Sequence, residues 1–91
     1  WELVVAKYFD LKRYHWKRNT KRFSYINLDG KEATYCPDFW IDEFSSFLEV
    51  KGYKTDLDEC KWKQFNEPLI IWNYSKLLEM KLIDKSGNPT I

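Results

Sequence analysis

Hydrophobic positions recur at helical spacing in three separate parts of the chain. In the segment 1–13, the apolar side chains share one broad helical face from residue 2 onward. Lys7, Asp10 and Lys12 lie on the opposite face. The segment 55–66 starts with Thr55 as an N-cap, followed by acidic residues in its first turn. Residues 74–82 continue the same spacing over a shorter length. The pattern therefore predicts three helices, at 1–13, 55–66 and 74–82.

The segment 14–52 is predicted to contain most of the strands. Short aromatic-rich segments at 14–18 and 22–27 precede two longer strands, at 31–41 and 44–51, and Asp29-Gly30 is a turn signal before the first of these. The continuous apolar run at 68–72 predicts a strand buried on both faces, and residues 83–91 form a polar tail. A strand, a helix and a buried strand in succession imply a right-handed parallel crossover. We therefore expect an α/β fold, a small mixed β-sheet flanked by helices in the order helix, strands, helix, strand, helix.

Composition indicates one domain with a packed core. The chain has 91 residues, of which 44% are hydrophobic and 19% aromatic, so there is material for one core and little room for a second domain. No apolar run is long enough to span a membrane. Because the chain opens on Trp1 instead of Met, we expect further residues upstream.

The cysteines indicate a reducing, cytoplasmic environment. Cys36 and Cys60 are the only two, they form no disulfide framework, and we expect two partly buried free thiols. A structural zinc ion needs about four ligands. Two cysteines and the single His15 do not supply that set, so we expect no zinc. We expect His15 to be exposed or hydrogen-bonded to a neighbour. We expect Trp1, Trp40 and Trp62 to be core residues.

A basic stretch stands out in a chain whose net charge is only +1. Residues 12–22 contain six cations, no acid and three interleaved aromatic side chains. Such a stretch suits a phosphate backbone and unstacked bases. It suits a solvated basic loop, or an edge strand protected by lysines, equally well. In the nucleic-acid interpretation, the phosphate contacts come from Lys17, Arg18, Lys21 and Arg22.

Charged residues interrupt the two most strand-like segments. Asp38 follows a proline and precedes an apolar triplet, while Glu49 and Lys51 alternate with apolar residues. If the two strands form a hairpin with a four-residue loop at 42–45, Ile41 pairs with Ser46 and Asp38 lies opposite Glu49.

Two facing carboxylates need a proton or a cation in order to coexist. Lys51 is a diagonal neighbour of Asp38 across the hairpin, and its positive charge partly relieves the repulsion between the two carboxylates. A ligand set made only of oxygen atoms favours a hard ion that keeps several waters, as Mg²⁺ does. The alternative is a surface hairpin with scattered charges and an ordinary Glu–Lys pair.

The residues Pro37-Asp38 and Glu49-Val50-Lys51 resemble the motif of the PD-(D/E)XK nuclease superfamily. The stretch LEVKGY, followed by a polar helix and an apolar strand, is similar to small phage-type and homing-type endonucleases of that superfamily and to archaeal Holliday junction resolvases. The resemblance covers roughly residues 1–82 and implies a restriction-endonuclease-like core.

The same resemblance implies a Mg²⁺-dependent DNA endonuclease that hydrolyses phosphodiester bonds, with Mn²⁺ as a substitute metal. It implies Asp38, Glu49 and the carbonyl of Val50 as metal ligands and Lys51 as the catalytic lysine. Glu2 matches an additional acid on the first helix. Lys61 and Gln64 are alternative candidates for a polar residue on the second helix, and Lys61 is also a candidate for DNA contact.

The resemblance implies DNA as the partner and an intracellular, phage-encoded protein in a bacterial host. One site cuts one strand, so cutting both strands requires a homodimer or two sequential nicks. Two alternatives remain open: a Holliday junction resolvase of the same superfamily, and a catalytically inactive nucleic-acid-binding module with the nuclease fold.

Overall fold

A four-stranded mixed sheet forms the centre of the molecule. The computed structural model describes residues 1–91, and its main sheet has the order β1 (Trp16–Arg18), β4 (Phe39–Ile41), β5 (Ser46–Lys51), β6 (Leu69–Asn73). The pairs β1–β4 and β4–β5 are antiparallel, whereas β5 and β6 are parallel and joined through α2 (Asp56–Gln64). The predicted mixed sheet with a strand–helix–strand crossover between parallel strands is confirmed.

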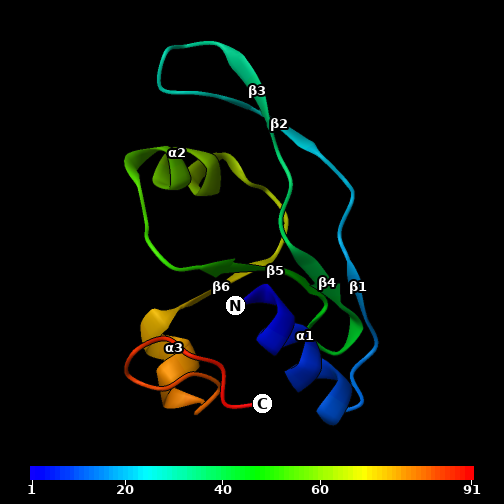
Figure 1. Ribbon diagram of the computed structural model, residues 1–91. Helices are drawn as coiled ribbons and strands as arrows, with labels where there is room; N and C mark the ends of the chain where they lie inside the picture. The colour runs from blue at the N-terminus through cyan, green and yellow to red at the C-terminus, as the bar shows by residue number, and fades with distance from the viewer.

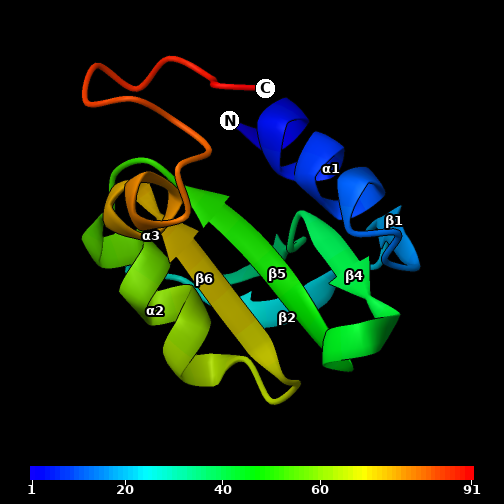
Figure 2. The same cartoon turned by 90° about the horizontal axis from the view of Figure 1, so that it is seen from below.

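Helices and a small hairpin cover the two faces of this sheet. Helices α1 (Glu2–Leu11) and α3 (Tyr74–Glu79) lie on one side, while α2 and the separate hairpin of β2 (Phe23–Ile26) and β3 (Glu32–Tyr35) lie on the other (Figure 1). Figure 2 shows β5 between β4 and β6, with both chain ends beside the start of α1. No helix has the length and apolar character needed to cross a membrane.

Both faces of β5 are therefore buried. On the α1 side, Leu48 is fully buried in a core that also contains Phe9 and Phe39. On the other side, Phe47 packs edge-on against aromatic rings of β2, β4 and the segment after α2, namely Phe23, Trp40 and Phe65. Each such buried apolar side chain stabilises the fold by roughly 1.5–3 kcal/mol. The same alternation buries Glu49, which follows Phe47 on its face and is 6% exposed.

The predicted strand at 31–41 is wrong as a single element. The structure divides it into β3, which pairs only with β2, and β4, which belongs to the main sheet. The break falls at Cys36-Pro37-Asp38. Proline has no N–H to donate to a ladder, so the chain can leave one sheet there and enter the other.

The predicted ends of two helices and the predicted burial of one strand also need correction. The first helix ends at Leu11, and the third ends at Glu79, just before Lys81, whose positive φ of 62° interrupts the helix. Strand β6 is the edge of the sheet, so its first three residues are only half-buried. The tail is anchored by a bridge between Ile83 and Pro89.

The three tryptophans expected in the core lie closer to the surface. Trp1 is 37% exposed, and its indole N–H donates to the carbonyl of Gly87 at 2.8 Å, which ties the start of α1 to the C-terminal segment. Trp40 and Trp62 are half-buried. The tryptophan that does belong to the main core is Trp72, on β6.

Candidate functional site

The β4–β5 hairpin has the predicted register. Ile41 pairs with Ser46 and Phe39 with Leu48, across a loop at residues 42–45 in which Ser45 adopts a left-handed conformation, with a φ of 47°. Continuing this register by one residue brings Asp38 opposite Glu49. The Asp38 carboxylate oxygen Oδ2 accepts a hydrogen bond from the backbone N–H of Val50 at 2.8 Å. This side chain thus extends the β4–β5 ladder by one residue before β4 begins.

The Asp38 carboxylate is held in a place that disfavours its charge. Burial raises its pKa to about 6, and the nearby negative charges of Glu2 and Glu49 act in the same direction. The hydrogen bond from Val50 and the positive charge of Arg18 oppose this shift without cancelling it. Asp38 therefore sits where a cation would relieve electrostatic repulsion.

Glu49 is fixed by a residue that the sequence did not single out. The hydroxyl of Tyr35, on β3, donates a hydrogen bond to Oε1 of Glu49. Burial and the adjacent Glu49 raise the pKa of Tyr35 well above its usual range, so the phenol stays protonated and acts as a donor. The other oxygen of Glu49, Oε2, remains 3.9 Å from the ammonium of Lys51.

Lys51 lies between two carboxylates. Its Nζ is 3.0 Å from Oδ1 of Asp58 and 3.9 Å from Glu49, and about a third of its side chain is exposed. Asp58 is the third residue of α2 and forms a capping box with Thr55. Although burial opposes the shift, hydrogen bonds from Thr55 and Lys51 lower the pKa of Asp58. Asp58 therefore remains charged and holds the lysine in place.

Glu2 reaches the same group from the start of α1. Its Oε1 lies 2.6 Å from a guanidinium nitrogen of Arg18, on β1, and its charge contributes to the raised pKa of Asp38. Arg18 also lies over the ring of Phe39 at 5.0 Å from the centroid. Glu2 and Val50 border a shallow hollow, which Trp1, Leu3 and Gly52 complete.

The charges of this group do not balance. Four carboxylates, from Glu2, Asp38, Glu49 and Asp58, interact with only two cations, Arg18 and Lys51. No three histidine, cysteine or acidic side chains come close enough together to hold a metal ion by themselves. Mg²⁺ is commonly bound by one or two carboxylates together with waters and substrate phosphates. The pair Asp38 and Glu49, with the carbonyl of Val50, fits that kind of ion by its donor chemistry.

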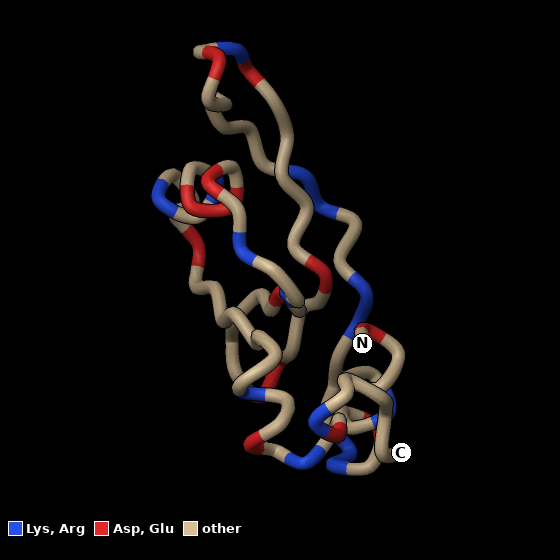
Figure 3. Tube along the Cα trace, turned by 60° about the vertical axis from the view of Figure 1, so that its left-hand side comes forward, with Lys and Arg blue, Asp and Glu red and all other residues tan.

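The basic segment runs along the sheet edge next to this group. Lys17 is exposed on edge strand β1, Lys21 lies over the ring of Phe23 at 5.1 Å, and Arg22 is exposed. Figure 3 shows these basic positions along one side of the chain, between the hairpin and the start of α1. Arg18 differs from them because its guanidinium is paired with the carboxylate of Glu2. Lys17, Lys21 and Arg22 are therefore the cations best placed for an outside anion.

Asn19 connects the basic segment to Asp38. It is 8% exposed, its side-chain amide donates to the carbonyl of Pro37 at 2.9 Å, and its backbone N–H donates to the carbonyl of Asp38 at 2.9 Å. Its Oδ1 accepts from the N–H of Lys21 at 2.9 Å. Asn19 thus fixes the backbone at Lys21 relative to the backbone at Pro37 and Asp38.

The two candidates on the second helix have different surroundings. Lys61 lies over the ring of Tyr35 at 5.6 Å from the centroid and borders a hollow beside the β2–β3 hairpin. Gln64 instead exchanges two hydrogen bonds of 2.8 Å with the backbone of Ile26, bracing the β2–β3 hairpin against α2. His15, whose side chain is 81% exposed, pairs with Glu43 at 2.8 Å. Of these residues, Lys61 is the one that contacts a residue of the acidic group's surroundings, namely Tyr35.

Tyr35 and Asp58 are the residues that sequence reasoning missed. Asp58 carried a signal, because Thr55-x-x-Asp58 is a capping pattern that starts four residues after Lys51. Tyr35 carried none, since it belongs to a different sheet from Glu49.

The chain matches no known family model, no curated protein and no solved structure.

Proposed function

We propose that this protein is a metal-dependent DNA endonuclease of the PD-(D/E)XK type, with a restriction-endonuclease-like core. The observation that carries the proposal is the pairing of β4 and β5, which brings Asp38 opposite Glu49 with Lys51 two residues further along. The surplus of carboxylates over cations around them supports a divalent cation, with Mg²⁺ as the physiological ion and Mn²⁺ as its substitute.

Each residue has a distinct role in this proposal. Asp38, Glu49 and the Val50 carbonyl hold the metal, and Glu2 completes the negative surroundings. When bound, the ion polarises the phosphoryl oxygens and lowers the pKa of a bound water. Lys51 donates hydrogen bonds to the charge that develops on the phosphate, while Asp58 fixes its ammonium. Lys17, Lys21 and Arg22 hold neighbouring phosphates.

The test is cleavage of supercoiled plasmid DNA with Mg²⁺, with Mn²⁺, or with EDTA. We expect nicking only with metal, and loss of nicking in both Asp38→Asn and Lys51→Met. Four-way junctions and linear duplex of matched sequence are compared in the same assay, because preferential cutting of junctions would identify a resolvase. Nicking that persists in EDTA, or in Asp38→Asn, would contradict the proposal.

A second candidate is a nucleic-acid-binding module with this fold and no catalysis. It is favoured by one observation: Lys51 is closer to Asp58 than to Glu49, so its charge is already neutralised within the protein. In that case DNA binding would persist without metal, and no cleavage would occur under any condition of the plasmid assay.

A further inference from the structure

A second hollow opens beside Lys51, next to the hollow that Glu2 and Val50 border. Its volume is about 310 Å³, near the lower end of the range of about 300–1,000 Å³ found for ligand pockets. Its lining comes from the loop after β5, from α2, and from the end of β6 with the start of α3. Gly52 borders both hollows, so they meet at this residue.

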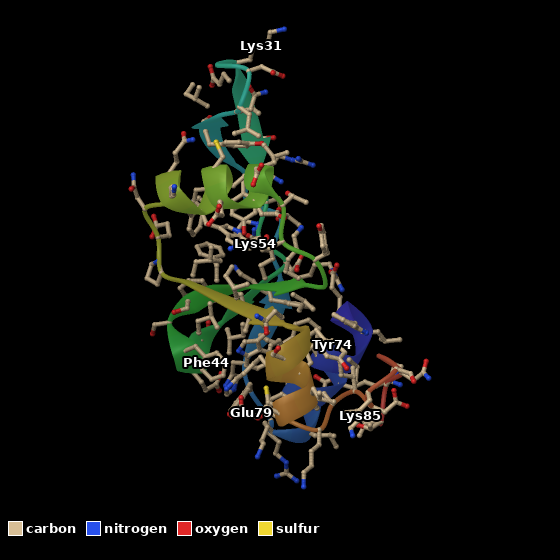
Figure 4. The ribbon with its side chains drawn as sticks, turned by 90° about the vertical axis from the view of Figure 1, so that its left-hand side faces the viewer. Lys31, Phe44, Lys54, Tyr74, Glu79 and Lys85 are labelled. Atoms are coloured by element: carbon tan, nitrogen blue, oxygen red, sulfur yellow. The ribbon has the colours of Figure 1, made fainter.

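The lining of this second hollow combines cations with aromatic and apolar surface. Lys51 and Lys54 are the two charged residues that border it. Trp62 and Ile71, both half-buried, provide apolar surface, and Tyr74 is held by a hydrogen bond from its hydroxyl to the carbonyl of Lys85 at 2.7 Å. Figure 4 looks onto this side, with Lys54 in the loop between β5 and α2 and Tyr74 at the start of α3.

Tyr53 is the most exposed large aromatic side chain of the protein, at 82%. It lies between the two lysines in sequence and borders the same hollow. Lys54 is held by Glu59 only through an exposed contact of 3.3 Å, an interaction of little strength. A free aromatic face beside the weakly held cation of Lys54 matches the chemistry of a nucleotide, whose base stacks and whose phosphates are anionic. Lys51 lies on the other side of Tyr53 in sequence and is already paired with Asp58.

We propose that this hollow is a subsite for one unstacked nucleotide next to the scissile phosphate, with its base on Tyr53 and its phosphate near Lys51 and Lys54. The proposal rests on the nuclease function and specifies its substrate class, which is DNA with unpaired nucleotides. A base inside a duplex cannot offer its face to Tyr53, because its neighbours already cover both faces. Single-stranded and branched DNA offer such a face without the cost of unstacking.

The test measures DNA binding in EDTA, so that it does not depend on cleavage. The probe is an oligonucleotide containing 2-aminopurine, used single-stranded and as a duplex of the same sequence. The proteins are the parent chain and the variants Tyr53→Ala, Tyr53→Phe, Lys54→Met and Leu28→Ala. Leu28 is a matched control because it is 63% exposed and lies in the turn of the β2–β3 hairpin, at the far end marked by Lys31 in Figure 4.

We expect Tyr53→Ala to weaken single-strand binding about 5- to 150-fold, which is the range for losing one base–aromatic stack. Tyr53→Phe should stay within about 2-fold of the parent because it keeps the ring. Fluorescence of 2-aminopurine should fall on binding to the parent and not on binding to Tyr53→Ala. Lys54→Met should lower the salt slope of single-strand binding by about 0.7. Leu28→Ala should change none of these quantities.

Three outcomes would overturn the proposal. The first is that Tyr53→Ala binds the single strand as tightly as the parent does, and the second is that it weakens duplex binding as much as single-strand binding. The third is that the parent protein binds neither probe. These outcomes are separable from failure of the nuclease function. A Tyr53-dependent single-strand complex in a protein that never nicks DNA would leave the subsite standing and remove the catalysis. Metal-dependent nicking together with single-strand binding that Tyr53→Ala leaves unchanged would remove the subsite and keep the catalysis.

Discussion

The ammonium of Lys51 lies 3.0 Å from Oδ1 of Asp58, on the first turn of α2. The other oxygen of the same carboxylate, Oδ2, accepts hydrogen bonds from the backbone N–H and the hydroxyl of Thr55 at 2.8 and 2.9 Å. One buried side chain therefore both caps the helix and positions the lysine, with a different oxygen for each task. The start of α2 and the lysine at the end of β5 are linked through this group.

Replacing Asp58 should cost more stability than removing the helix cap alone. Thr55→Ala removes the threonine's part of the capping box, and we expect it to lower the free energy of unfolding by about 1 kcal/mol. Asp58→Ala also removes the ionic partner of Lys51, so we expect a loss of about 2–3 kcal/mol. Urea denaturation of the two variants measures the difference. Equal losses would show that the contact between Asp58 and Lys51 contributes nothing to stability.

Lys51→Met should reduce metal-dependent cleavage by about 10²–10³-fold, because one stabiliser of the transition-state charge is lost. It also leaves the buried Asp58 without its cation, so we expect a loss of stability of about 1–2 kcal/mol. The double variant Lys51→Met, Asp58→Asn should recover most of that stability without recovering cleavage. Cleavage within a few-fold of the parent, measured on the folded fraction of Lys51→Met, would remove Lys51 from the catalytic role.

Asp38 should make the metal-free protein less stable as the pH rises from about 4 to about 7. Its pKa is raised to about 6 in the folded state, so the folded protein binds a proton in this range that the unfolded chain has already released. The stability lost across this pH range is on the order of 2 kcal/mol once solvent screening of this half-buried group is allowed for. Asp38→Asn can still accept the Val50 hydrogen bond and carries no charge. We expect this variant to lack that decline in thermal melts recorded in EDTA; parallel pH profiles for the two proteins would argue against the assignment.

The exposed cations of the basic segment should contribute to DNA affinity regardless of sequence. Replacing Lys17 and Arg22 together by alanine should lower the salt slope of log K for duplex DNA by about 1.8, since each lost phosphate contact contributes about 0.9. Lys7→Ala is the control, because Lys7 is exposed on α1 and lies outside this segment. A loss confined to one DNA sequence would indicate contacts with bases instead of phosphates.

Arg18→Ala should behave differently from those variants. Because Arg18 is paired with Glu2 at 2.6 Å, its removal frees a negative charge beside Asp38 instead of removing a free cation from the DNA-facing surface. We expect little change in the salt slope and a further rise in the pKa of Asp38. The carboxyl resonance of Asp38, followed by NMR titration against the parent protein, checks this. An unchanged titration would mean that Arg18 does not act on Asp38.

Local sequence signals determined much of the secondary structure and the hairpin that carries Asp38 and Glu49. The turn at 42–45 and the period-two alternation of β5 fix the pairing of Ile41 with Ser46, and both signals lie within a few residues of each other. The same holds for the start of α2, where Thr55 and the acids behind it specify the cap. Such elements depend on neighbours in sequence, so they could be predicted without the fold.

Only the tertiary structure decided what surrounds those residues. The break at Pro37 sends β3 into a second sheet, which then covers the face of β5 that carries Glu49 and brings Tyr35 to its carboxylate. Asp58 reaches Lys51 because α2 packs back over the sheet, and Arg18 reaches Glu2 because β1 pairs with β4 beside α1. These contacts join residues from separate elements, and they form only where packing of both sheet faces brings the elements together. The sequence determined which carboxylates and which lysine could form a site, while their burial, their partners and the raised pKa of Asp38 arise from that packing.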